Sequence, residues 1–216
     1  MAEVRGEPVV GLRERKKQRT RATLIDAAVE LCDRQGFDRT TVDQIAAIAD
    51  VSPRTFSRYF ATKDAIAMAL VDEVVDRAAV ELDRQPLDIS HFEALLRSYV
   101  GMANATKLAP AGELSTDRLM RIARIVVSSP TLRQSALEYR GSSIDTALAK
   151  RIGAGLDDRK VKLMSAVWAS VIMTALTNLG DQGLDWTQLG IDDVIDQLEA
   201  TYAELAGEIG ALRQPV

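Results

Sequence analysis

The chain has 216 residues, of which 47% are hydrophobic and only 5% aromatic, with 27 Lys and Arg against 31 Asp and Glu. This composition supplies enough apolar side chains for a buried core and excludes a disordered chain. A single cysteine, Cys32, excludes an intrachain disulfide, and a single histidine, His91, excludes a histidine-based metal cluster. The N-terminus lacks the apolar core of a signal peptide, so we expect a cytoplasmic protein. We also expect neither a metal nor a cofactor.

Positive charge is concentrated near the N-terminus, although the whole chain has a formal charge of −4. Residues 1–63 contain 12 Lys and Arg against 9 Asp and Glu, whereas residues 64–216 contain 15 against 22. Between Arg13 and Arg21, six basic side chains stand beside one acid, Glu14. A basic segment on an acidic body is typical of local DNA contact, although a solvated basic tail has the same composition.

The spacing of apolar residues predicts an all-α fold, because no segment alternates strongly enough to predict a strand. Residues 1–12 contain two glycines and a proline and predict a flexible N-terminal arm. A helix is expected from Arg13 to about Gln35, with Gly36 as its stop.

Two short helices set close together form the most informative stretch, residues 41–59. Thr41 and Gln44 have the spacing of a capping box, in which each side chain binds the other residue's backbone N–H. Ser52 is a good N-cap, and Pro53 follows at the first helical position, where its missing N–H is harmless. Only two residues separate these helical patterns, which is typical of a helix-turn-helix.

One ordered set of residues within this region carries a resemblance: Gly36-Phe37, Thr40-Thr41-Val42, Ile45-Ala46, Val51-Ser52, Thr55-Phe56, Tyr59-Phe60, Lys63 and Ile66. With the basic helix before it, this set resembles the DNA-binding segment of the tetracycline-repressor (TetR) family over roughly residues 13–70. The resemblance implies a three-helix DNA-binding domain at 13–62. It also implies a helical effector-binding and dimerisation domain at 63–216.

The resemblance also implies which residues bind operator DNA. Thr41, Tyr59 and Lys63 would contact phosphates, while the second short helix would lie in the major groove. The residues expected to face the groove are Pro53, Arg54, Thr55, Ser57 and Arg58. An arginine there can bind guanine O6 and N7 together, with discrimination of about 1–3 kcal/mol. In the alternative interpretation, Tyr59 is a half-buried ring that stabilises the motif and Lys63 lies on a solvated face.

Six further helices are predicted after the motif. The first begins after the cap Thr62 and ends before Pro86, and Ser90 with Glu93 has the spacing of another capping box. A loop is expected at Thr106–Ser115. The predicted helices are Lys63–Arg84, one that begins at Ser90, Thr116–Ser128, Thr131–Ile152, Asp158–Asn178 and Ile191–Leu212.

The last two helices indicate a homodimer. The segment Leu163–Leu179 is apolar on nearly every side, yet it is shorter than the roughly 20 apolar residues of a membrane span. The last helix has apolar residues in alternating steps of four and three, the spacing of a coiled-coil seam: Ile191, Ile195, Leu198, Tyr202, Leu205, Ile209 and Leu212. One chain could cover both surfaces internally, but a four-helix bundle between two copies, similar to that of TetR-like proteins, covers them more simply.

The resemblance further implies a pocket for a small apolar effector in the C-terminal domain. Large side chains that are expected on the surrounding helices are Tyr99, Met102, Met120, Tyr139, Met164, Trp168 and Met173. Methionines and aromatic residues at helical spacing are also typical of an ordinary core, which remains the alternative. Cys32 is expected to be buried, and His91 to lie at the surface.

These observations together predict a DNA-binding transcriptional regulator that is not an enzyme. We expect a dimeric repressor that an effector releases from a palindromic operator, without a membrane partner. No nucleophile–base pair or glycine-rich phosphate loop supports catalysis. A helical small-molecule carrier or a protein-interaction scaffold remains the alternative, and DNA binding that weakens steeply with salt would distinguish them.

Overall fold

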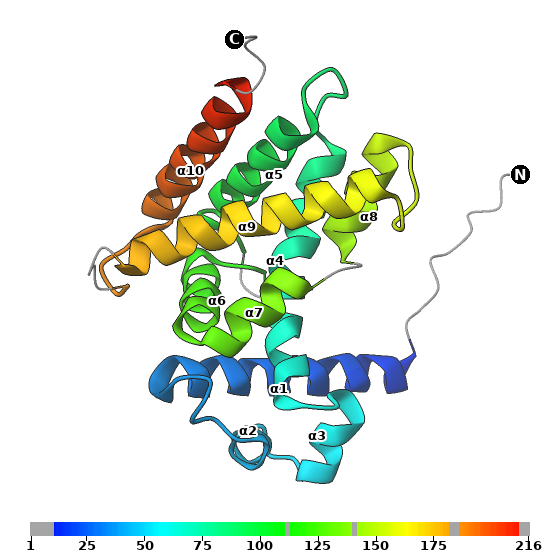
Figure 1. Ribbon diagram of the computed structural model, residues 1–216. Helices are drawn as coiled ribbons and strands as arrows, with labels where there is room; N and C mark the ends of the chain where they lie inside the picture. The colour runs from blue at the N-terminus through cyan, green and yellow to red at the C-terminus, as the bar shows by residue number, and fades with distance from the viewer. Residues whose placement is uncertain (1–10, 111–112, 140–141, 182–185, 212–216) are drawn as a thin grey trace, which may run out of the picture.

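The computed structural model of the protein describes residues 11–110, 113–139, 142–181 and 186–211. These ranges contain ten helices and no strand, which confirms the all-α prediction (Figure 1). Of the predicted N-terminal arm, residues 1–10 lie outside the described ranges, and Leu12 is the first residue of a helix. The helices are α1 Leu12–Gln35, α2 Val42–Ile48, α3 Pro53–Tyr59, α4 Lys63–Asp83, α5 His91–Thr106, α6 Thr116–Ser128, α7 Pro130–Glu138, α8 Ser143–Ile152, α9 Arg159–Asp181 and α10 Ile191–Ala211.

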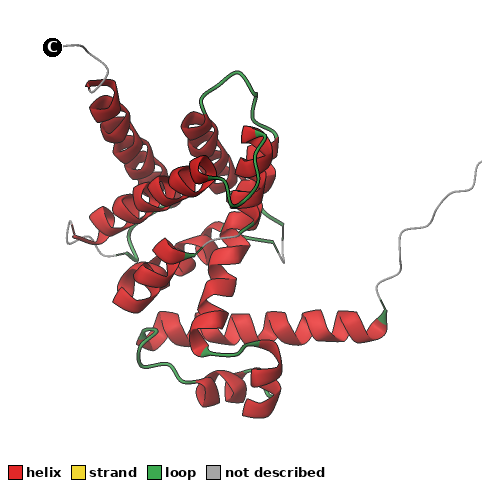
Figure 2. Ribbon diagram, turned by 45° about the vertical axis from the view of Figure 1, so that its right-hand side comes forward, coloured by secondary structure: helices red, strands yellow, loops and turns green. Residues whose placement is uncertain are grey.

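Helices α1 to α3 form a unit at one end of the molecule, with α2 and α3 side by side beneath α1 (Figure 1). Leu24, Ile45 and Phe56 join them in a common core, where each is at most 1% exposed. Helix α4 leaves this unit and runs into the remaining helices (Figures 1 and 2). It is therefore the continuous element between the two parts of the fold.

The helix caps predicted near the N-terminus are present. The Thr41 hydroxyl accepts a hydrogen bond from Gln44 N at 3.2 Å, and Gln44 Oε1 accepts one from Thr41 N at 2.9 Å. Ser52 Oγ accepts from Thr55 N at 3.1 Å at the start of α3. The turn between α2 and α3 passes through Asp50, whose φ of 52° is in the left-handed region. These bonds join residues three apart, so the start of each short helix is determined by local sequence.

Helices α4 to α10 form the second part of the fold. Helix α4 packs against α5 and α8, and α9 packs against α10. Leu70, Leu95 and Leu148, each 1% exposed, continue the same buried core through α4, α5 and α8. The core is thus contiguous from the helix-turn-helix to the far end of the molecule.

The single helix predicted at Thr131–Ile152 is wrong, because two helices occupy this range. Helix α7 ends before Tyr139, which is extended, with φ −64° and ψ 122°. A new helix then begins after Ser142, where Ser142 and Asp145 form a capping box. Serine followed three residues later by an acid is a helix-start signal that the continuous apolar spacing concealed.

The second predicted capping box is only half formed. Ser90 Oγ accepts from Glu93 N at 3.1 Å, as expected for an N-cap. The Glu93 carboxylate instead accepts a hydrogen bond from Arg97 Nε at 2.8 Å, one helical turn later. The ion pair with Arg97 thus replaces the predicted bond from Glu93 to the backbone of the cap residue.

Helix α9 contains a segment, Arg159–Gly180, that is long and apolar enough to cross a membrane by length and composition, with a mean hydropathy of 1.4. Only 28% of its most apolar window is buried within the chain. The exposed face includes Leu163, which is 60% exposed, together with the small polar residues Ser170 and Thr174. Because core helices of soluble proteins have the same length and composition, this helix gives only weak support for a membrane span.

Gly36→Ala should lower the free energy of unfolding by about 1–3 kcal/mol, because φ 83° and ψ 152° form a conformation that is essentially restricted to glycine. No neighbouring atom lies within 4 Å of a Cβ placed there, so the effect would come from the backbone alone. Gly155→Ala is the control, because Gly155 has as much space for a Cβ and no positive φ. Its free energy of unfolding, measured in urea like that of Gly36→Ala, should change by less than about 0.5 kcal/mol. Equal effects of the two substitutions would contradict this explanation.

Candidate functional site

Helix α3 presents a polar face on the outside of the molecule. Pro53, Arg54, Ser57 and Arg58 are all exposed, while Phe56 on the opposite side is 1% exposed and anchors the helix. Four of the five residues predicted to face DNA therefore share one accessible surface. Thr55, the fifth, is half-buried, and its hydroxyl lies 2.9 Å from Ser52 Oγ within the cap.

Tyr59 lies where α3 meets α1. Its ring is partly buried, and the guanidinium carbon of Arg58 lies 5.3 Å from the ring centre. A hydrogen bond with Thr20 lowers the pKa of Tyr59, and the charges of Arg58 and Lys17 act in the same direction. The phenol is thus surrounded by positive charge while its ring packs against the domain, so the two predicted roles do not exclude one another.

Lys63 binds the loop between α1 and α2. Its Nζ donates to the carbonyl oxygens of Phe37, at 2.9 Å, and Asp38, at 3.5 Å. The ammonium also lies 4.1 Å from the centre of the Phe37 ring. Lys63 is therefore held against the loop that leads to Thr41, which is exposed at the start of α2.

The N-terminal half of α1 adds positive charge beside α3. Figure 2 shows this half projecting beyond the other helices, and residues 11–19 are all exposed. The guanidinium carbon of Arg21 lies 5.3 Å from the ring centre of Phe60, which follows α3. The basic segment seen in the sequence therefore lies next to the polar face of α3.

A cavity of about 180 Å³ lies among helices α4 to α10. Most of its lining is aliphatic, including Val74 on α4, Ile122 on α6 and Leu198 on α10. Met164, which was expected to line it, is buried outside the lining. The other six predicted residues line it: Tyr99, Met102, Met120, Tyr139, Trp168 and Met173.

Polar groups occur at a few places on the cavity wall. Burial raises the pKa of the Tyr99 hydroxyl, and the nearby Asp145 carboxylate raises it further. The Tyr139 hydroxyl donates a hydrogen bond to Asp72, and burial together with this bond raises its pKa to about 12. Both phenols are therefore neutral at physiological pH and can take part in hydrogen bonds.

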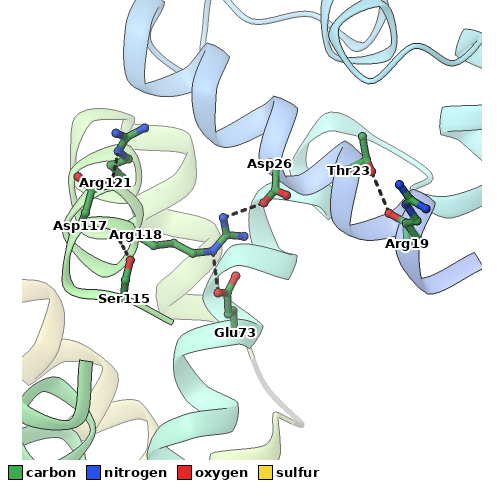
Figure 3. A network of polar contacts seen from close by, with 8 residues as sticks. All are labelled: Arg19, Thr23, Asp26, Glu73, Ser115, Asp117, Arg118 and Arg121. Atoms are coloured by element: carbon green, nitrogen blue, oxygen red, sulfur yellow. Dashed lines mark hydrogen bonds and ion pairs between the residues drawn. The ribbon is translucent and has the colours of Figure 1, made fainter. Parts of the chain in front are cut away.

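An arginine on α6 connects the cavity wall to the DNA-binding part (Figure 3). Arg118 Nε donates to Glu73 on α4 at 2.7 Å, and its Nη1 donates to Asp26 on α1 at 2.8 Å. Although burial opposes its charge, the bonds to Glu73 and Asp26 raise the pKa of Arg118. Arg124, which is six residues after Arg118 on α6, pairs with Asp33 on α1. No sequence signal indicated these pairs, because the partners are 45 to 92 residues apart.

Cys32 and His91 are not part of the DNA-binding surface or of the cavity lining. Within the described ranges, no group of three His, Cys, Asp or Glu residues could hold a metal ion. Cys32 is buried, as predicted, and burial raises the pKa of its thiol. His91, expected at the surface, is partly buried beside Lys160, and burial lowers its pKa.

Comparison with known proteins gives matches to one family. The family described as "Bacterial regulatory proteins, tetR family" matches residues 24–70. The HTH-type transcriptional regulator TcmR of Streptomyces glaucescens is 32% identical over 154 residues, which cover 68% of this chain and 67% of that protein. The A-factor receptor protein of Streptomyces griseus is 32% identical over 65 residues, which are 30% of this chain and 24% of that protein.

Solved structures share the fold over most of its length. Thermus thermophilus FadR, a TetR-family repressor in complex with lauroyl-CoA, has a TM-score of 0.51 and 22% identity, and the match covers 86% of this chain and 93% of that one. A TetR-family regulator from Streptomyces coelicolor has a TM-score of 0.53 and 19% identity, over 89% of this chain and 98% of that one. At these identities the two structures show a common fold.

The helix-turn-helix geometry, the match over its residues and the relationship that extends along two thirds of TcmR agree with one another. The chain belongs to the TetR family of DNA-binding transcriptional regulators.

Proposed function

We propose that this regulator is a dimeric repressor that leaves a palindromic operator in the cytoplasm when a small apolar molecule enters the cavity. The observation that carries the proposal is that α4 and α6 both line the cavity and both bind residues of the DNA-binding part. Val71 and Val74 on α4 and Ile122 on α6 line the cavity, while Lys63 and Arg118 on the same helices bind the DNA-binding part. TcmR is a transcriptional regulator, and the two solved structures are a TetR-family repressor and a TetR-family regulator.

The DNA surface would comprise the outer face of α3 and the basic half of α1. Arg54 and Arg58 are exposed on α3 and can reach guanine edges in the major groove. Thr41 and Tyr59 flank this helix and would contact phosphates, as would Lys63, which uses two of its three N–H groups for the Phe37 and Asp38 carbonyls. Pro53, Thr55 and Ser57 would lie close to the groove.

The dimer would form through α9 and α10. The outer face of α9 carries exposed Leu163, Ser170 and Thr174, a mixture of apolar and small residues that allows helices to approach closely. On α10, the predicted seam divides. Ile191, Ile195 and Leu198 are buried in the same chain, whereas Tyr202 and Leu205 are only partly buried and Ile209 is 39% exposed; Leu212 lies outside the described residues. A four-helix bundle with a second copy would cover this second half.

Effector control would act by population shift. A ligand that fits the cavity in only one position of α4 and α6 favours that position and changes the separation of the two α3 helices in a dimer. The ion pairs from Arg118 would carry a displacement of α6 to α1 directly.

Arg54→Ala should weaken operator binding by about 1–3 kcal/mol and relax the preference for one base pair in each half-site. Lys17→Ala on α1 should weaken binding to all sequences alike and reduce the salt dependence by about one counterion per subunit. The measurement is selection from random duplex DNA, followed by affinity titrations at several salt concentrations. An unchanged selected sequence for Arg54→Ala would contradict its assignment to base contact.

Thr174→Arg should dissociate the dimer, because a large charged side chain would replace a small one in a close helix contact. Sedimentation at micromolar concentration should show a monomer with reduced operator affinity. Thr146→Arg on α8 is the control, since Thr146 is exposed outside the proposed bundle. A dimer that survives the Thr174 substitution unchanged would place the interface elsewhere.

Arg118→Met should leave ligand affinity in the cavity within about twofold of wild type and reduce the effect of ligand on operator affinity at least fivefold. The reason is that both ion pairs to α1 and α4 disappear while the cavity-facing side of α6 is retained. Operator affinity is measured with and without ligand. Arg97→Met, which removes an ion pair within α5 alone, should leave the ligand effect intact. A full ligand effect in Arg118→Met would show that coupling follows another route.

A further inference from the structure

Two polar atoms on the cavity wall are buried without a hydrogen-bond partner. They are Trp168 Nε1 and Ser165 Oγ, both on α9 and both in residues that line the cavity. Trp168 is only 3% exposed. Residues three apart lie on the same face of a helix, so both atoms belong to the same side of the cavity.

Ser165 differs from two other hydroxyl residues of α9, Ser170 and Thr177. Ser170 Oγ donates to the carbonyl oxygen of Ala166 at 3.0 Å, and Thr177 Oγ1 donates to that of Met173 at 2.8 Å. Serine and threonine within helices usually bind backward in this way. The Ser165 hydroxyl makes no such bond, so its donor is unused at a residue that lines the cavity.

The Trp168 indole has a donor and no acceptor. Its ring centre lies 5.6 Å from that of Tyr99, and its N–H lies close enough to favour the ionised form of the Tyr99 hydroxyl. No hydrogen bond of normal geometry forms between them. A buried donor without an acceptor is unfavourable, and a molecule that brings an acceptor would relieve this cost.

The rest of the wall limits the chemistry of such a molecule. Its described lining contains Asp145 but no Lys, Arg or His, so a ligand carboxylate or phosphate would meet no cationic partner among these residues. The volume of about 180 Å³ is similar to that of an engineered apolar cavity, about 150 Å³, that holds a benzene ring. One or two rings with short substituents therefore fit.

We propose that the effector is an uncharged, largely apolar ring compound whose carbonyl or ether oxygen accepts hydrogen bonds from Trp168 Nε1 and Ser165 Oγ. This inference rests on the proposed role of the cavity as the effector site. The two donors fix the orientation of the oxygen, and the aliphatic side chains opposite α9 enclose the ring.

The test uses two probes of similar size, 1-acetylnaphthalene and 1-ethylnaphthalene, in which a carbonyl group of the first is a methylene group in the second. Their affinities are measured by calorimetry with the full-length protein and with Trp168→Phe and Ser165→Ala. The ketone-to-hydrocarbon affinity ratio should fall about fivefold to tenfold in Trp168→Phe and at least about twofold in Ser165→Ala. Because the ratio is compared between proteins, the different hydration of the two probes cancels.

Trp186→Phe is the matched control, since Trp186 lies outside this cavity, and its ratio should equal that of wild type. The carboxylate 1-naphthoate should bind wild type more weakly than the ketone does. A ratio unchanged in both α9 variants, tighter binding of the carboxylate, or no binding of either probe would overturn the proposal. Operator binding is measured separately on the same proteins, so that a loss of DNA binding would count against the proposed function and not against the ligand class.

Discussion

The arrangement of this molecule depends on the two-sided character of α6. One side of the helix contributes Leu119, Ile122 and Val126 to an apolar cavity, and the other side carries arginines that pair with acids of the DNA-binding part. A guanidinium removed from water requires nearby carboxylates, so the position of α1 relative to α6 is fixed by charge as well as by packing. The same helix cannot move at the cavity without disturbing these pairs. The cavity wall and the DNA-binding part are thereby joined through one helix.

Local signals in the sequence predicted much of the DNA-binding part. The caps at Thr41, Ser52 and Thr62 all form, because each requires only residues within one helical turn. The exposed face of α3 followed from the same reasoning, since burial of Phe56 determines which side faces outward. Contacts across the chain could not be found in this way. The bonds of Lys63 to the Phe37 and Asp38 carbonyls join residues about 25 positions apart and leave no periodic trace.

The cavity shows a second limit of sequence reasoning. Core and cavity residues have the same apolar spacing, so a pattern identifies large buried side chains without indicating which of them border empty space. Met164 and Met173 illustrate the point: they lie on one helix and are both buried, but only Met173 lines the cavity. The break between α7 and α8 was missed for a related reason, since apolar periodicity continued through a position where Ser142 begins a new helix.

The division of α10 has a consequence for two copies acting together. Its first turns form part of the cavity wall through Ile191, Ile195 and Leu198, and its later turns carry the uncovered half of the seam. In a dimer built on α9 and α10, a single rigid rod would therefore border the ligand in one subunit and touch the neighbouring subunit further along. The two cavities would then be coupled, and a ligand in the first would change the affinity of the second. When the first ligand makes the second easier to bind, such a regulator responds to its effector over a narrower range of concentration than two independent sites allow.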